Sequence, residues 1–153
     1  MLVVPFTNSY LEDVYSIQQQ AYRPLFEKYQ DTETNPYMES KEQVAKKYGK
    51  LGTYGYVFLE NDIPVGSVRI VSKGNVRKVS ALAVLPDYQN RGIAQRALKE
   101  IERRHRESKI WVLDTLMQEA GNCHLYEKIG YRRTGTPVVV NEKLTLVRYI
   151  KQR

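Results

Sequence analysis

The segment between residues 76 and 101 constrains the fold more than any other part of the chain. Its run Ala81–Leu85 is apolar at every position, which is typical of a central strand that is covered on both faces. Pro86 ends this strand. Apolar residues at helical spacing over residues 90–107 then predict an amphipathic helix that lies on the sheet. The sequence therefore predicts a mixed α/β fold built in layers.

Periodicity predicts the remaining elements in the same way. A strand is expected over residues 1–6, helices over 11–21, 40–48 and 119–129, a hairpin over 54–71, and strands over 110–113 and 144–150. Arg23-Pro24 is expected to break or restart the first helix, and the polar stretch 29–37 to form an ordered loop. Because no repeat or linker interrupts the pattern, we expect one domain spanning residues 1–153.

Composition narrows the classes of function. The chain has 153 residues, 24 Lys and Arg against 17 Asp and Glu, and no apolar run of about 20 residues, so no membrane partner and a cytoplasmic location are expected. One cysteine and two histidines cannot build a disulfide framework or a cysteine-rich zinc site, and we expect no metal. The net charge of +7 suits either nucleic acid or a phosphorylated small molecule.

The position of the charged residues favours the small molecule. The run 102–107, which contains His105, is interpreted as a solvated helix end. Together with Arg132 and Arg133 this run would form a basic patch, but it lacks the interleaved aromatic residues that stack on bases, so no specific nucleic-acid partner is expected. Cys123 and His124 are neighbours on a predicted helix and point about 100° apart, so Cys123 is expected to be a small buried residue rather than a nucleophile.

A site for an anion is predicted where the central strand gives way to the following helix. The segment Val84–Ala94 passes through a proline and a turn and opens the helix with Gly92 in its first turn. Unpaired backbone N–H groups and the helix dipole meet there, and small side chains let a phosphate approach the backbone, so a pyrophosphate is the expected ligand. The chain has neither of the common glycine-rich nucleotide motifs. Taken alone, Gly92 favours close packing of helix on sheet over an anion site.

Two motifs in this order resemble the GCN5-related N-acetyltransferase (GNAT) family. Gln89-Asn-Arg-Gly92-Ile-Ala94 is similar to the family pattern Gln/Arg-x-x-Gly-x-Gly/Ala, and Leu125-Tyr-Glu-Lys-Ile-Gly-Tyr131 is similar to its second signature. The order of elements fits from about residue 2 to 150. The resemblance implies an α/β (α+β) fold with a mixed, mostly antiparallel central sheet, splayed in the middle and covered by helices on both faces.

The resemblance also implies acetyl-CoA as cosubstrate and a site to hold it. The pantetheine arm would pair with the main chain of the central strand, where a bulge makes room for it, and the pyrophosphate would lie on the amides of the loop. Arg91 and Arg96 would add positive charge. The implied cofactor-binding residues are Leu82, Ala83, Val84, Gln89, Asn90, Arg91, Gly92, Ile93, Ala94 and Gln95.

In such enzymes a substrate amine attacks the thioester directly. Tyr126 matches the family tyrosine that protonates the leaving thiolate, and a main-chain N–H near Val84 would hold the thioester oxygen. Members often have an asparagine seven residues before this tyrosine, where the chain has Glu119. Asn122 lies one helical turn before Tyr126 and is expected to reach the CoA arm instead.

The acceptor site is less constrained. The family implies that the first long loop builds it, and Tyr22, Tyr29 and Asp31 are candidates for a pocket that binds a cationic amine. The same tyrosines fit a rim or a surface equally well. No carboxylate lies on the central strand, so the general base is unassigned: Glu119, or Asp31 through a water, is one option, and an amine that arrives neutral is another.

We therefore expect an N-acetyltransferase that uses acetyl-CoA to acetylate a primary amine, the amine of a small molecule being favoured. A protein N-terminal or lysine acetyltransferase and a non-catalytic acyl-CoA sensor are the alternatives. C-terminal strands often pair in folds of this kind, which leaves a homodimer open.

Overall fold

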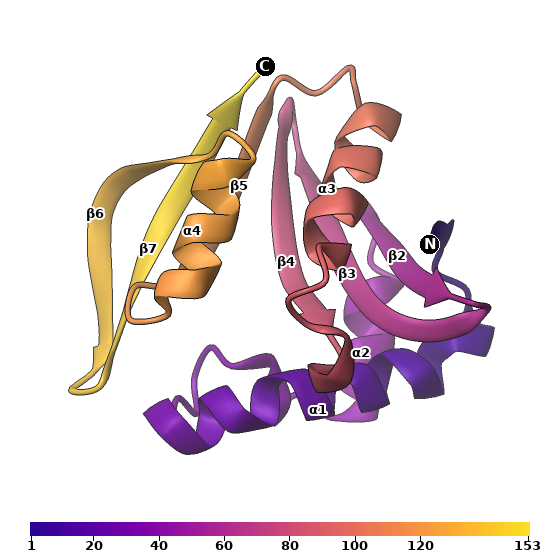
Figure 1. Ribbon diagram of the computed structural model, residues 1–153, viewed down its shortest axis with the longest axis horizontal. Coiled ribbons are helices and arrows are strands. Elements are labelled where there is room, and N and C mark those ends of the chain that lie inside the picture. The colour runs from indigo at the N-terminus through magenta and orange to yellow at the C-terminus, as the bar shows by residue number, and fades with distance from the viewer.

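A seven-stranded sheet organises the protein, and the computed structural model describes all residues from 1 to 153 (Figure 1). The strand order is β1-β2-β3-β4-β5-β7-β6, and only β4 and β5 are parallel. The strands are β1 (Leu2–Pro5), β2 (Thr53–Glu60), β3 (Ile63–Lys73), β4 (Val76–Val84), β5 (Ile110–Leu116), β6 (Arg132–Asn141) and β7 (Leu144–Gln152). The α-helices are α1 (Leu11–Tyr29), α2 (Lys41–Tyr48), α3 (Ile93–Arg104) and α4 (Ala120–Lys128). None of them combines the length and the hydrophobicity of a membrane-spanning segment.

Helices cover both faces of the sheet, as expected. α1 and α2 pack against one face through a small core that includes Val14, Val44 and Val57. The larger core lies on the other face, where the apolar stripe of α3 meets the strands and α4. Trp111 and Tyr149, from β5 and β7, are fully buried. The apolar stripe of α3 predicted from its spacing is therefore confirmed.

The sheet splays between β4 and β5. These two strands are paired over only three residues of each, from Val76 with Ile110 to Lys78 with Val112. Beyond this point they diverge, and the wedge opens toward α1 (Figure 1). The splay expected from the family resemblance is present, and it leaves one side of β4 without a neighbouring strand.

A bulge in β4 lies at the start of the wedge. Ser80 pairs with Arg69 and Ala83 with Ser67, so two residues of β4 oppose one residue of β3. The extra residue is accommodated by a positive φ of 50° at Ala81, and such a bulge bends the strand. On β3, a Cβ at Gly66 would stand 2.8 Å from the carbonyl oxygen of Ala83. The glycine therefore allows the bulged strand to approach closely.

Two elements differ from the sequence prediction. α1 runs through Pro24 without interruption, although a proline inside a helix costs about 3 kcal/mol. Contacts on both sides of Pro24 offset this cost, because the hydroxyl of Tyr22 donates to the carbonyl of Leu82 and the hydroxyl of Tyr29 donates to Glu119. Strand β6 was not predicted at all. It lies at the edge of the sheet, and its residues are mostly exposed.

The interpretation of the run 102–107 as a solvated helix end is wrong for two of its residues. Glu102 and His105 are only 4% and 5% exposed. Glu102 accepts a hydrogen bond from the hydroxyl of Tyr131, and Nε2 of His105 lies 2.7 Å from the hydroxyl of Tyr56. Because His105 follows Ile101 by four residues, it continues the apolar face of α3 beyond the helix end.

Buried His105 makes stability depend on pH. Burial lowers its pKa, and the nearby charges of Arg77 and Arg104 act in the same direction against the opposing influence of Glu107. The unfolded chain therefore binds a proton more readily than the folded one. The free energy of unfolding should be highest above about pH 6.5, the ordinary histidine pKa, and fall as the pH drops below it.

Chemical denaturation between about pH 7.5 and 5.5 measures this effect. In His105→Gln, which keeps an acceptor for Tyr56 but does not titrate, the decline over this range should be smaller than in the wild type. An unchanged decline in the variant would assign the pH dependence to other groups.

Candidate active site

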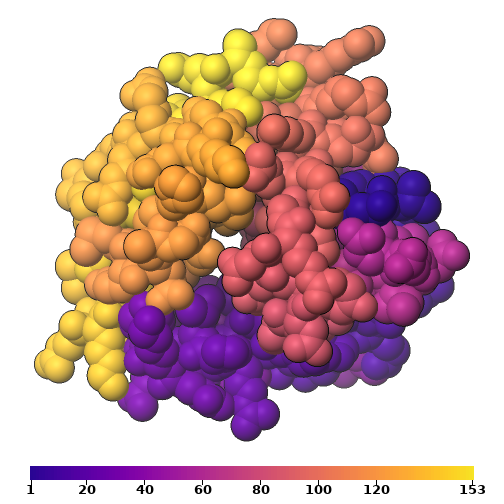
Figure 2. All heavy atoms as spheres, in the orientation of Figure 1, coloured from indigo at the N-terminus to yellow at the C-terminus, as the bar shows by residue number.

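A cavity of about 810 Å³ occupies the wedge between β4 and β5. In Figure 2 it appears as the hollow between α4, in orange, and the loop before α3, in salmon, with α1 in indigo beneath it. Its lining comes from α1, α2 and the loop between them, from β3, β4, β5 and β7, from the start of α3 and from α4. The splay therefore creates the site.

The loop between β4 and α3 forms one wall of this cavity. A short 3-10 turn at Pro86–Tyr88 is followed by positive φ angles at Asn90 (62°) and Gly92 (77°). Gly92 is the N-cap of α3, and a Cβ placed on it would have no atom within 4 Å. The backbone N–H groups of the first turn of a helix lack partners within the helix. The loop is thus an open cradle at a helix N-terminus, which fits the pyrophosphate of acetyl-CoA.

Most of the predicted donor-site residues line the cavity. They are Leu82, Ala83, Val84, Gln89, Asn90, Gly92, Ile93, Ala94, Gln95 and Asn122. Arg91 does not line it: its guanidinium lies over the ring of Tyr88, 5.0 Å from the centroid. Arg96 also points elsewhere and lies 3.6 Å from Glu60. In this structure neither guanidinium lies in the cavity lining, and their role beside the phosphates stays a prediction.

Two carbonyl groups of β4 that face this region already accept hydrogen bonds from side chains. The amide of Gln89 donates to the oxygen of Val84 at 2.9 Å, and the hydroxyl of Tyr22 donates to the oxygen of Leu82 at 2.5 Å. The first contact fixes the cofactor loop to the end of β4. The second fixes α1 to the bulge. Each carbonyl oxygen keeps a second lone pair for a ligand.

Tyr126 differs from the two tyrosines packed around it. Its ring lies 6.1 Å from that of Tyr131 and 6.3 Å from that of Tyr149. Their hydroxyls donate to Glu102 and Glu127, whereas the hydroxyl of Tyr126 makes no hydrogen bond within the protein, and Tyr126 lines the cavity. Burial raises the pKa of the Tyr126 phenol. Tyr126 is therefore protonated at neutral pH and has a free donor in the cavity.

The predicted acceptor residues separate into two groups. Tyr22 and Asp31 line the cavity, but Tyr29 does not. Tyr29 instead supports the site from outside, since its hydroxyl donates to Glu119, which does line the cavity. Asp31 is only 4% exposed and accepts from the N–H groups of Glu33 and Thr34 and from the Thr34 hydroxyl. Asp31 therefore holds its own loop in shape.

Each carboxylate that lines the cavity has partners in the protein. Glu119 accepts from Tyr29 and Lys28, Asp114 pairs with Arg148 and Lys78, and Glu39 pairs with Lys47. Burial alone would raise the pKa of Glu119, but its hydrogen bonds lower it. Asp114 follows the same pattern: Arg148 and Lys78 lower its pKa against the effect of burial. Both groups are therefore ionised at neutral pH.

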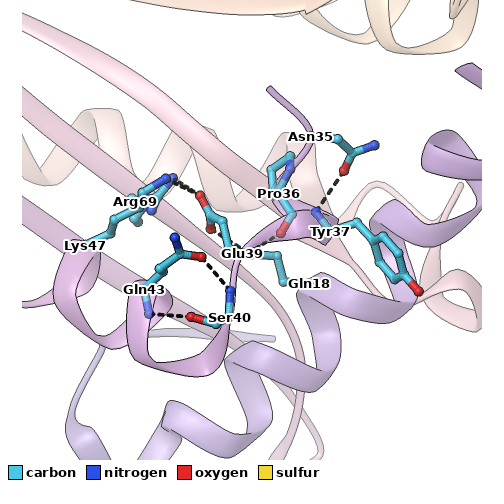
Figure 3. A network of polar contacts seen from close by, with 9 residues as sticks. All are labelled: Gln18, Asn35, Pro36, Tyr37, Glu39, Ser40, Gln43, Lys47 and Arg69. Carbon is cyan, nitrogen blue, oxygen red and sulfur yellow. Dashed lines mark hydrogen bonds and ion pairs between the residues drawn. The ribbon is translucent and has the colours of Figure 1, made fainter. Parts of the chain in front are cut away.

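The sequence analysis missed five charged residues of the cavity, which are Glu39, Lys47, Arg69, Lys78 and Asp114. Glu39 precedes α2, Lys47 lies on α2 and Arg69 lies on β3, and Figure 3 shows them together. The sequence does hold a signal for Arg69, because it is the one charged residue in the otherwise uncharged run Val65–Val71. An arginine inside such a strand needs a polar environment that hydrophobic periodicity does not describe.

The chain is similar to a known family of proteins and to solved structures. The family model described as "Acetyltransferase (GNAT) family" matches residues 11–131. A search of curated proteins finds no match. Among solved structures, the chain is similar to a ribosomal-protein-alanine N-acetyltransferase from Brucella melitensis (TM-score 0.79, 18% identity, covering 100% of each chain).

Two further structures show the same fold. One is the ribosomal-protein-S18-alanine N-acetyltransferase from Escherichia coli (TM-score 0.79, 15% identity, 99% of this chain and 92% of that one). The other is a spermidine N-acetyltransferase from Vibrio cholerae in complex with CoA and spermine (TM-score 0.78, 16% identity, 99% and 94%). With the family match across most of its length, the chain belongs to the acetyltransferase (GNAT) family, and acetyl-CoA is its cosubstrate.

Proposed function

We propose that residues 1–153 act as one domain that transfers the acetyl group of acetyl-CoA to the primary amine of a small molecule, in the cytoplasm. The observation that carries this proposal is the hydroxyl of Tyr126. It has no partner within the protein, and it lines the same cavity as the anion-binding loop and the unpaired side of β4. The loop that binds the donor, the hydroxyl that donates the proton and the space for the acceptor thus lie in one cavity.

Each part of the site has a separate role in this proposal. The amides of the loop from Gln89 to Gln95 hold the pyrophosphate of acetyl-CoA. The main chain of Leu82 to Val84, together with Asn122, orients its pantetheine arm. Acetyl-CoA supplies an activated thioester.

The backbone of β4 near Val84 stabilises the charge that develops on the thioester oxygen. As the new N–C bond forms and the C–S bond breaks, Tyr126 donates a proton to the leaving thiolate. The acylated nitrogen releases its extra proton to solvent, and Tyr126 regains one from solvent. Because the site holds the amine and the thioester close together and correctly oriented, this positioning supplies much of the remaining rate enhancement.

No general base is included in this proposal. Glu119 and Asp31, the two groups considered from the sequence, are both engaged in hydrogen bonds that hold neighbouring segments. The amine therefore loses its proton to solvent before it reaches the thioester. This is consistent with a cavity that is open on the face shown in Figure 2.

The donor half of the proposal is tested by thermal unfolding with acetyl-CoA, CoA and ATP side by side. A ligand that binds only the folded state adds RT ln(1 + [L]/Kd) to the free energy of unfolding, about 2.7 kcal/mol at one hundred times Kd. For a chain of this length that is a rise in Tm of roughly 5–11 °C. We expect a saturable rise with acetyl-CoA and CoA but not with ATP. No rise at millimolar acetyl-CoA would contradict the proposal.

A further inference from the structure

Arg69 is a buried cation that shares its one carboxylate neighbour, Glu39, with Lys47. It is only 8% exposed, and it lines the cavity from β3. The nearest carboxylate is that of Glu39, whose Oε2 lies 3.8 Å from Nη2 of Arg69, too far for a hydrogen bond. Nε and Nη1 of Arg69 have no hydrogen-bond partner. The ring of Tyr48 lies behind the guanidinium, 5.9 Å from its Cζ.

Glu39 compensates the charge of Arg69 only in part, because it is also engaged by two other side chains. Its Oε1 accepts a hydrogen bond of 2.7 Å from Gln18, and its Oε2 forms an ion pair with Lys47 (Figure 3). Gln18 is held in place by a second bond, to the carbonyl of Pro36. The cluster thus contains two cations, Arg69 and Lys47, and one carboxylate, a net charge of +1. An excess of positive charge beside a buried guanidinium is unfavourable, and an anion in the cavity would balance it.

The cluster lines the cavity beside the bulge of β4. In the β3–β4 register Arg69 is opposite Ser80, next to the bulge, and Tyr22 bonds to Leu82 within the bulge. Tyr22, Tyr126 and Arg69 all line this cavity. An acceptor that presents its amine at the Tyr126 end can place a second group against Arg69.

We propose that Arg69, with Lys47 beside it, binds a carboxylate of the acceptor, so that the substrate is a small molecule with both a primary amine and a carboxylate. This inference rests on the proposed function and specifies its substrate class. A guanidinium matches the planar carboxylate, and one negative charge balances the net +1 of the cluster. The carboxylates lining the cavity have partners, so a polyamine would find no free anion there.

The first test compares three series of amines of matched chain length, by release of CoA. They are ω-amino carboxylates from glycine to 6-aminohexanoate, the corresponding amino alcohols, and the corresponding diamines. The wild type should prefer the amino carboxylate of the optimal length by roughly 10- to 100-fold in kcat/KM, as expected for a charge-assisted hydrogen bond. Equal values for amino carboxylates and amino alcohols at every length, or a preference for diamines, would overturn the inference.

The second test uses Arg69→Gln, with Arg69→Lys as the conservative variant. In Arg69→Gln the preference should collapse through a higher KM for the amino carboxylate, while KM for the amino alcohol and Kd for acetyl-CoA stay as in the wild type. Arg69→Lys should recover part of the preference, because it keeps the charge and loses the planar fork. A preference that is unchanged in Arg69→Gln would overturn the role of this residue.

A binding measurement separates this inference from the proposed function. Carboxylic acids that lack the amine, from acetate to hexanoate, are titrated calorimetrically into the wild-type protein loaded with CoA. Saturable binding that is lost in Arg69→Gln supports the anion site whether or not any amine is acetylated, and no binding at any chain length opposes it. The absence of CoA release from every amine, together with no thermal shift by acetyl-CoA, would instead defeat the proposed function.

Discussion

Replacing Tyr126 by phenylalanine is expected to lower kcat by a factor of about 10² to 10⁴, the usual contribution of a positioned proton donor. The affinity for acetyl-CoA should stay nearly the same, because the ring still packs against Tyr131 and Tyr149. Thermal stability should also be preserved, since the hydroxyl that is removed makes no hydrogen bond within the protein. Steady-state release of CoA and a titration with acetyl-CoA measure the two effects separately.

Tyr149→Phe is a matched control for this experiment. It removes a hydroxyl of the same cluster that donates to Glu127 and does not belong to the cavity lining. We expect a loss of stability of about 1 kcal/mol and an unchanged kcat. If Tyr126→Phe instead weakened acetyl-CoA binding strongly and left kcat intact, the hydroxyl would be a binding group and its assignment as the acid would be wrong.

The isosteric change Gln95→Glu is expected to weaken acetyl-CoA binding roughly thirtyfold, equivalent to about 2 kcal/mol. Gln95 lies in the first turn of α3 and lines the cavity, so a glutamate there would repel the pyrophosphate. The same glutamate favours folding, because an acidic residue near a helix N-terminus typically contributes about 0.3–1 kcal/mol. Binding and stability should therefore change in opposite directions, which damage to the fold cannot produce.

Gln20→Glu makes the same chemical change on the exposed side of α1, outside the cavity. It should leave Kd for acetyl-CoA at the wild-type value. The effect in Gln95→Glu should also shrink as ionic strength rises, because added salt screens repulsion between charges that are partly exposed. A Kd in Gln95→Glu equal to that of the control would move the pyrophosphate away from the start of α3.

The donor site was predictable because its signals are local. A short stretch of sequence specifies the end of a strand at Pro86, a turn, and the start of a helix near Gly92 with its apolar face. The structure has all three elements. The splay followed from the family resemblance. The residue that takes the positive φ in the bulge, Ala81, has no signal of its own, because a bulge arises from how β4 meets β3. The assigned roles of the individual site residues remain predictions.

The errors share a physical cause, which is that tertiary contacts override local preference. Pro24 was expected to interrupt α1, but the bonds of Tyr22 and Tyr29 hold the helix on both sides of it. His105 was placed at the surface because charged residues flank it, although its spacing from Ile101 pointed to the core. Strand β6 escaped detection because one exposed edge strand has no buried face to impose an alternating pattern.

The acceptor end was the least predictable part of the site. Asp31 and Tyr29 had the right chemistry for a cationic ligand, but they are used to hold the loop and α4 in place. The partners that decide which charges are free lie far apart in the sequence, as Gln18, Glu39 and Arg69 do. The sequence shows which residues are charged. Only the fold shows which of these charges are balanced by a partner.

The short pairing between β4 and β5 makes the resistance of the protein to proteolysis depend on the concentration of its ligand. The sheet is joined there by three residue pairs, and any molecule that bridges the wedge binds the folded form alone. Proteases in a cell act mainly on the unfolded fraction, which shrinks as such a ligand becomes more abundant. The lifetime of the protein in the presence of proteases should therefore lengthen as acetyl-CoA becomes more abundant and shorten as it becomes scarce.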